Sequence, residues 1–204
     1  MKSVVSITVF ALLLSIAIIA PATETAVPKG IETVPEKDVP PKKRTKQGLY
    51  LTAKEAYQMW RADPLKTILL DVRIPAEYVF VGHPPMAYNV PYEFWRSDVL
   101  SKDGTVVMKI NPKFIEHVKK VASPDETLLV MCRSGKRSAK ACDALAKAGY
   151  KKVFNIVDGF EGDAVKDRRS SSYAKRTKNG WRNSRMPWTY ELRRNLMYLP
   201  KDKK

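Results

Sequence analysis

The sequence predicts a single α/β domain with a mainly parallel central sheet of about five strands and helices on both faces. Short apolar runs alternate with helical patterns of about ten to fifteen residues, and this alternation requires right-handed crossovers between parallel strands. The chain of 204 residues is long enough for one hydrophobic core but short for two complete domains. No internal repeat divides it into smaller units.

Local signals define the first elements of the domain. In LTAKEAYQMWRAD, residues 51–63, Thr52 and Glu55 stand three apart as in a helix capping box, and the apolar positions share one face. KTILLDV, residues 66–72, has the continuous apolar pattern of a short buried strand. A second, weaker strand is expected at YNVPY, residues 88–92.

The second half of the domain continues the alternation. NPKFIEHVKKVA, residues 111–122, is expected to be a helix with its asparagine as the cap and its proline at the first helical position. ETLLVMC, residues 126–132, is again an apolar strand. RSAKACDALAKAG, residues 137–149, predicts a helix closed by its glycine, and KVFNIVDG, residues 152–159, predicts a further strand.

Residues 1–22 have the organisation of a secretory signal peptide. One lysine precedes an apolar run, and the run ends in Ala-Pro-Ala, the small-x-small pattern that a signal peptidase accepts. The protein is therefore expected to be exported, in a bacterium to the periplasm. The alternative is an anchor that is not cleaved, because the apolar stretch from Val4 to Ala20 approaches the roughly 20 residues that span a bilayer.

Two segments flank the expected domain, which comprises residues 48–160. Residues 23–47 contain four prolines and the run KKRTK, a composition typical of a flexible linker. Residues 161–204 form a basic extension with aromatic residues, which is expected to pack on the domain. From Phe160 to the C-terminus there are 13 Lys and Arg residues against 5 Asp and Glu residues. The late stretch WTYELRRNLMYL has the spacing of an amphipathic helix, although core packing explains the same pattern.

The two cysteines are expected to be free thiols with different roles. Cys132 and Cys142 are ten residues apart across a predicted helix, and a rise of about 1.5 Å per residue places them beyond the ~7 Å Cα separation of a disulfide. Cys142 falls on the alanine face of that helix and is expected in the core. Cys132 stands where a strand gives way to a helix, and functional groups gather at such junctions in parallel sheets. The alternative is that Cys132 is one more small apolar residue at the end of a buried strand.

Cys132 opens the loop CRSGKRS, residues 132–138, which favours a reactive thiolate. If the loop curls between strand and helix, its backbone N–H groups converge into an anion nest at the positive end of the helix dipole. Thiolates are stabilised at helix N-termini and beside cations, and three cationic side chains follow the cysteine within five positions. We expect Cys132 to be the catalytic residue, and the substrate-binding residues of the loop to be Arg133, Ser134, Gly135, Lys136 and Arg137.

The loop, together with LLDVRIPAEYVFVGHPPMAYNVP upstream and VFNIVDGFEGD downstream, resembles the rhodanese family of sulfurtransferases over residues 48–160. The resemblance implies that Cys132 takes a sulfane sulfur from a small anionic donor such as thiosulfate and carries it as a persulfide. A thiophilic acceptor, such as a thiol or cyanide, then receives the sulfur. Related cysteine phosphatases and arsenate reductases place five residues between cysteine and arginine, whereas four separate Cys132 from Arg137. The shorter ring suits a sulfur atom better than a phosphoryl group.

Under this mechanism the cations of the loop bind the sulfonate group of the donor, with Arg137 turned inward at the helix start. Sulfite leaves as a stabilised anion, so neither His83 nor His117 is required as a base. No cofactor and no metal ion are expected.

Asp71, Arg73 and Glu77 form the DVR-x-x-x-E pattern after a predicted strand. They are expected to fix the catalytic loop by charged hydrogen bonds. The alternative is an ordinary surface ion pair. The resemblance supports the positioning role for Asp71 and Arg73 more than for Glu77.

The sequence departs from the family after the last strand. Many family members continue with a Gly-Gly pair and a nearby tryptophan, whereas here Gly159 is followed by Phe160 and a long basic insertion. Trp181 or Trp188 is expected to pack back over the core. The insertion lies near the site and leaves the identity of the acceptor open.

The formal charge of +16 indicates an anionic partner of some kind. The basic extension is either a solvated face or a docking surface for an acidic partner protein or an anionic membrane. Binding of nucleic acid is not expected, because export argues against it. The alternative function is a non-catalytic rhodanese-like module that docks an acidic partner or senses sulfur species. The cysteine in its cationic loop favours the enzyme.

Overall fold

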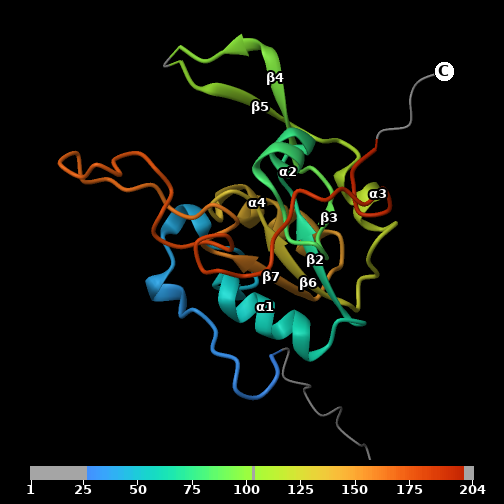
Figure 1. Ribbon diagram of the computed structural model, residues 1–204. Coiled ribbons are helices and arrows are strands. Elements are labelled where there is room, and N and C mark those ends of the chain that lie inside the picture. Colours follow the sequence, from blue (N-terminus) through green and yellow to red (C-terminus); the bar gives the residue numbers. More distant parts are fainter. Residues whose placement is uncertain (1–26, 103, 200–204) are drawn as a thin grey trace, which may run out of the picture.

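The computed structural model describes residues 27–102 and 104–199 and confirms the predicted fold class (Figure 1). The central sheet has the order β1-β7-β6-β2-β3, and all of its strand pairs are parallel. The expected signal peptide lies outside the described residues, and within them no helix is long and apolar enough to span a membrane. The strands of the sheet are β1 (Tyr50–Leu51), β2 (Thr67–Asp71), β3 (Tyr88–Asn89), β6 (Thr127–Met131) and β7 (Lys152–Ile156).

Two pairs of helices cover the two faces of this sheet, as predicted. The helices α1 (Ala53–Ala62) and α2 (Pro75–Val81) contribute to the apolar cluster on one face. The helices α3 (Phe114–Val118) and α4 (Lys136–Lys147) contribute to the cluster on the other face. The expected capping box of α1 is present.

Helix α3 is shorter than predicted. Its expected cap, Asn111, instead accepts a hydrogen bond from the Lys113 backbone N–H (3.0 Å) and donates to the carbonyl of Pro91 (2.9 Å). These contacts hold a turn before the helix, so the helix begins at Phe114.

An antiparallel hairpin of β4 (Glu93–Leu100) and β5 (Val106–Ile110) projects from the domain at the top of Figure 1. The predicted fold lacks this hairpin. A signal for it exists in the Asp-Gly dipeptide at 103–104, which stands between two runs with strand composition.

The segment before β1 differs from the flexible linker expected over residues 23–47. Its described part contains two short 3-10 helices, η1 (Glu36–Asp38) and η2 (Pro41–Lys43), and buries Val39 and Lys43. The Lys43 ammonium forms an ion pair with Asp163 (2.8 Å) in the C-terminal extension. Contacts between residues so distant in sequence leave no local pattern, and they make this segment part of the domain.

The C-terminal extension returns to the core. Trp181 is fully buried in the cluster that contains α1, and its indole Nε1 donates to the carbonyl of Pro187 (2.8 Å). The amphipathic helix considered for residues 188–199 does not form. Thr189 instead exchanges backbone hydrogen bonds with His83 (2.8 and 2.9 Å), and the carbonyl of Leu196 accepts from the Asn89 N–H (2.8 Å).

Candidate active site

Cys132 directly follows β6, the middle strand of the sheet, and its loop leads into α4. Strands β2 and β6 are parallel neighbours in register, with Asp71 opposite Met131. Both therefore end at the same edge of the sheet, where the DVR pattern and the cysteine loop meet. The side chain of Cys132 is buried, with 2% of its surface exposed.

The backbone of the loop offers a continuous set of hydrogen-bond donors. Within the described residues, none of the six successive N–H groups from Arg133 to Ser138 donates to another protein group. Three of them belong to the first turn of α4, where the helix dipole is positive. These free donors are available to stabilise a sulfur or oxygen anion at Cys132, and the anion nest itself stays a prediction.

Two glycines allow the loop to pack against the segment after β7. Gly135 has a φ of 88°, and a Cβ atom there would lie 2.2 Å from the carbonyl oxygen of Val157. Gly159 has a φ of 63°, and a Cβ atom there would lie 2.5 Å from the carbonyl oxygen of Cys132. The same carbonyl accepts a hydrogen bond from the Phe160 N–H (2.8 Å). Phe160, where the sequence departs from the Gly-Gly pair of the family, thus holds the cysteine through its backbone N–H.

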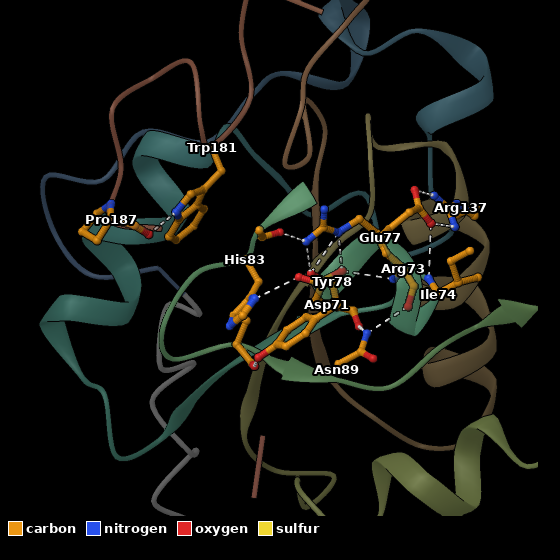
Figure 2. A network of polar contacts seen from close by, with 12 residues as sticks. Asp71, Arg73, Ile74, Glu77, Tyr78, His83, Asn89, Arg137, Trp181 and Pro187 are labelled. Carbon is orange, nitrogen blue, oxygen red and sulfur yellow. Dashed lines mark hydrogen bonds and ion pairs between the residues drawn. The ribbon is translucent and has the colours of Figure 1, made fainter. Parts of the chain in front are cut away.

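Asp71 and Arg73 form a fully buried ion pair rather than a surface pair (Figure 2). The Arg73 Nη2 lies 2.6 Å from Asp71 Oδ2 and donates to the carbonyl of Gly82 (2.8 Å). Its guanidinium carbon lies 4.2 Å from the centre of the Phe160 ring. The pair therefore supports the loop indirectly, through Phe160, whose N–H holds the carbonyl of Cys132.

Glu77 makes the direct contact with the loop. Its carboxylate accepts two hydrogen bonds from Arg137, at 2.7 and 2.6 Å, and joins α2 to the first turn of α4 (Figure 2). Burial raises the pKa of Glu77, but the hydrogen bonds and charge of Arg137 and the charge of Arg73 outweigh it and lower the pKa below its ordinary value. Arg137 is thus paired with Glu77 and also lines the pocket beside the loop, and its role in binding the donor stays a prediction.

Ser138 lies between Cys132 and an amide that the prediction omits. Its Oγ is 3.4 Å from Cys132 Sγ and 2.6 Å from Asn155 Oδ1. Asn155 Nδ2 donates to the carbonyls of Lys43 (2.8 Å) and Gly135 (3.1 Å), which fixes Oδ1 as an acceptor. Because a hydroxyl carries one proton, Ser138 donates either to Asn155 or to a thiolate at Cys132. The signal for Asn155 was a lone amide in an otherwise apolar strand.

A pocket of about 230 Å³ lies between the loop, α2 and the hairpin. One wall is charged and is formed by Glu77, Arg133 and Arg137. The other lining residues are apolar: Ile74, Trp95, Val106 and Met108. Arg133 is exposed and makes no ion pair within the described residues, so it is the cation of this pocket that remains open to an anion. The other predicted loop residues with side chains, Ser134 and Lys136, line a different groove.

Cys142 lies on the buried face of α4 in the core, as expected, and neither cysteine forms a disulfide. Burial raises the pKa of its thiol well above the ordinary value, and the charges of Asp143 and Cys132 act in the same direction. The described residues contain no cluster of His, Cys, Asp or Glu that could hold a metal ion.

Residues 52–164 match the family model of the rhodanese-like domain. The chain belongs to this family. It is 46% identical over 93 residues to thiosulfate sulfurtransferase 18 of Arabidopsis thaliana, covering 45% of this chain and 62% of that protein. It is 38% identical over 91 residues to thiosulfate sulfurtransferase 16, chloroplastic, of the same plant, covering 45% of this chain and 68% of that protein.

Two further comparisons set the extent of the likeness. The protein HIGH ARSENIC CONTENT 1, mitochondrial, of A. thaliana is 38% identical over 91 residues, covering 45% of this chain and 48% of that relative, so the chain spans about half of its length. The crystal structure of Rv0390 from M. tuberculosis superposes with a TM-score of 0.54 at 28% identity, covering 70% of this rhodanese-like chain and 97% of that chain.

Proposed function

We propose that this rhodanese-like protein is a sulfurtransferase that carries a sulfane sulfur as a persulfide on Cys132. The observation that carries the proposal is the run of six N–H groups after Cys132, at the start of α4, that have no protein acceptor among the described residues. Such a backbone stabilises a charged sulfur without requiring a cofactor. The sulfurtransferase names of two relatives support the same reaction class.

In the first step, the Cys132 thiolate attacks the outer sulfur of a donor such as thiosulfate. A new S–S bond forms at Cys132, the S–S bond of the donor breaks, and sulfite leaves with the electron pair. No proton is transferred, which agrees with the described contacts of the two histidines: the His83 ring contacts Tyr78 and Glu191, and the His117 ring contacts Tyr198. Arg133, as the open cation of the pocket, binds the sulfonate group of the donor.

In the second step, a thiolate or cyanide attacks the terminal sulfur of the persulfide, and Cys132 leaves as a thiolate. Ser138 assists both steps by turning its proton from Asn155 toward whichever charged sulfur is present. The apolar lining of the pocket, with Trp95 and Met108, favours an acceptor that has an apolar group beside its thiol. We also propose that the reaction takes place outside the cytoplasm, on the basis of residues 1–22.

A turnover assay with thiosulfate and cyanide tests the proposal by measuring thiocyanate. We expect activity in the unmodified protein and in the Cys142→Ala variant, and none in Cys132→Ser. Unchanged activity in Cys132→Ser would overturn the mechanism. Absence of turnover in the unmodified protein with every sulfane donor and acceptor tested would favour the non-catalytic binding module instead.

A further inference from the structure

A second and larger groove, of about 750 Å³, borders the catalytic loop. Three parts of the chain form it: the η2 turn, the loop with the start of α4, and the insertion that follows residue 162. In Figure 1 the insertion, in orange, projects from the domain on the side where the η2 turn lies. The loop contributes Ser134 and Lys136, so an occupant of the groove lies beside the residues that surround Cys132.

The groove is strongly cationic. A single carboxylate, Asp163, is present in its lining, and the buried Lys43 neutralises it at 2.8 Å. The Asn179 side chain donates to the Asp163 carboxylate (3.2 Å) and accepts from the Asp163 backbone N–H (2.8 Å). Asp163 is therefore held by hydrogen bonds as well as by its ion pair with Lys43. Within the described residues, five further cations form no ion pair: Lys42, Lys136, Lys166, Arg176 and Lys178.

Arg176 lies within reach of the charge of Arg133 in the catalytic loop. Burial is the main cause that lowers the pKa of its guanidinium, and the charge of Arg133 lowers it further, while the charges of Glu161, Asp163 and Cys132 act in the opposite direction. Positive charge is therefore concentrated from the catalytic loop to the insertion, and an anionic occupant would relieve the repulsion.

We propose that this groove binds an extended acidic segment of the protein that exchanges sulfur with Cys132. This inference rests on the proposed function, because the partner's thiol is what the docking brings to the site. The size of the groove and the spread of its cations over three chain segments exceed what one thiosulfate ion can contact. A flexible chain of carboxylates can reach all of them.

The side chains of the groove distinguish a polypeptide from a nucleic acid. Its lining, which lies wholly within the described residues, includes no aromatic ring on which a base could stack. It contains one arginine, Arg176, whose Nη1 already donates to the carbonyl of Gly162 (2.5 Å). The remaining cations are lysines, which act as point charges and do not provide the planar fork that favours phosphate.

Fluorescence anisotropy with a labelled oligo-glutamate peptide tests the inference. The protein carries Cys132→Ser in every sample, so that binding is measured without sulfur transfer. We expect saturable binding that weakens with salt. The triple charge reversal Lys42→Glu, Lys166→Glu and Lys178→Glu is expected to weaken it by at least about tenfold, because three attractions become repulsions.

A second triple variant controls for net charge. Lys54→Glu, Lys109→Glu and Lys119→Glu reverse three exposed lysines outside the groove that form no ion pair within the described residues. We expect this variant to retain most of the affinity, and thermal unfolding checks that both triples remain folded.

Absence of peptide binding, or an equal loss in the two triples, would overturn the inference. Tighter binding of a single-stranded oligonucleotide through the same three lysines would also overturn it, in favour of a nucleic acid. The binding assay uses Cys132→Ser and therefore does not depend on sulfur transfer. A failure to bind the peptide would not argue against the persulfide on Cys132, and a failure to form the persulfide would not change the measured affinity for the peptide.

Discussion

The carboxylate of Glu77 and the guanidinium of Arg137 form a two-point ion pair, at 2.7 and 2.6 Å, between α2 and the first turn of α4. Both side chains are mostly buried, with 17% and 16% of their surfaces exposed. The pair joins α2 to the helix end that carries the free N–H groups after Cys132.

Substitution of Glu77 by glutamine tests this relationship. Glu77→Gln leaves Arg137 without its charged partner, and we expect the free energy of unfolding to fall by about 1–3 kcal/mol. We also expect slower sulfur transfer, because the helix start is less firmly held. Urea unfolding and thiosulfate turnover measure the two effects. A variant with unchanged values for both would show that the pair has no positioning role.

Asp158 predicts a pH dependence of stability. Its carboxylate accepts hydrogen bonds from the N–H groups of Ala53 (2.8 Å) and Gly180 (2.9 Å). Burial raises its pKa from 3.8 to about 6, against the effect of these hydrogen bonds. Between these two pKa values the folded chain holds a proton on Asp158 that the unfolded chain has lost. The contribution of Asp158 to the free energy of unfolding therefore falls as pH rises through this range, and it levels off above pH about 6.

Urea unfolding of the unmodified protein and of Asp158→Asn measures this pH dependence. The two pKa values set the range to be covered, roughly pH 4 to pH 7. The stability of the unmodified protein relative to the variant is expected to decrease with rising pH up to about 6. A constant difference across the range would contradict the raised pKa.

Substitution of Gly135 by alanine is expected to cause a steric clash that the same substitution at Gly149 does not cause. In Gly135→Ala the new Cβ would meet the carbonyl of Val157 at 2.2 Å, whereas at Gly149 nothing lies within 4 Å although φ is 97°. We expect Gly149→Ala to cost about 1 kcal/mol, from backbone strain alone. Gly135→Ala is expected to cost more and to reduce turnover, because the loop must shift. Equal losses of stability and activity in the two variants would contradict this account.

Ser138→Ala tests the proton that Ser138 shares between Asn155 and Cys132. Removing the hydroxyl deletes a hydrogen bond to the charged sulfur, so turnover is expected to fall by about tenfold or more. Single-turnover persulfide formation is the measurement, with the free energy of unfolding as the control for folding. Turnover equal to that of the unmodified protein would exclude the role of Ser138.

Features set by neighbouring residues could be predicted from the sequence, and features set by distant contacts could not. The α1 cap, the apolar strands and the position of Cys132 at a strand end each follow from a short pattern. Glu77 and Arg137 are 60 positions apart, and Lys43 and Asp163 are 120 apart. The sequence predicts a charged contact between Glu77 and the catalytic loop, but no local pattern identifies Arg137 as its partner or pairs Lys43 with Asp163.

The measurement that tests the central claim most directly is the intact mass of the protein after incubation with thiosulfate. We predict a gain of one sulfur atom, about 32 Da, that cyanide or a reductant removes. The gain is expected in Cys142→Ala and not in Cys132→Ser. A gain that persists in Cys132→Ser, or no gain with any sulfane donor, would contradict a persulfide on Cys132.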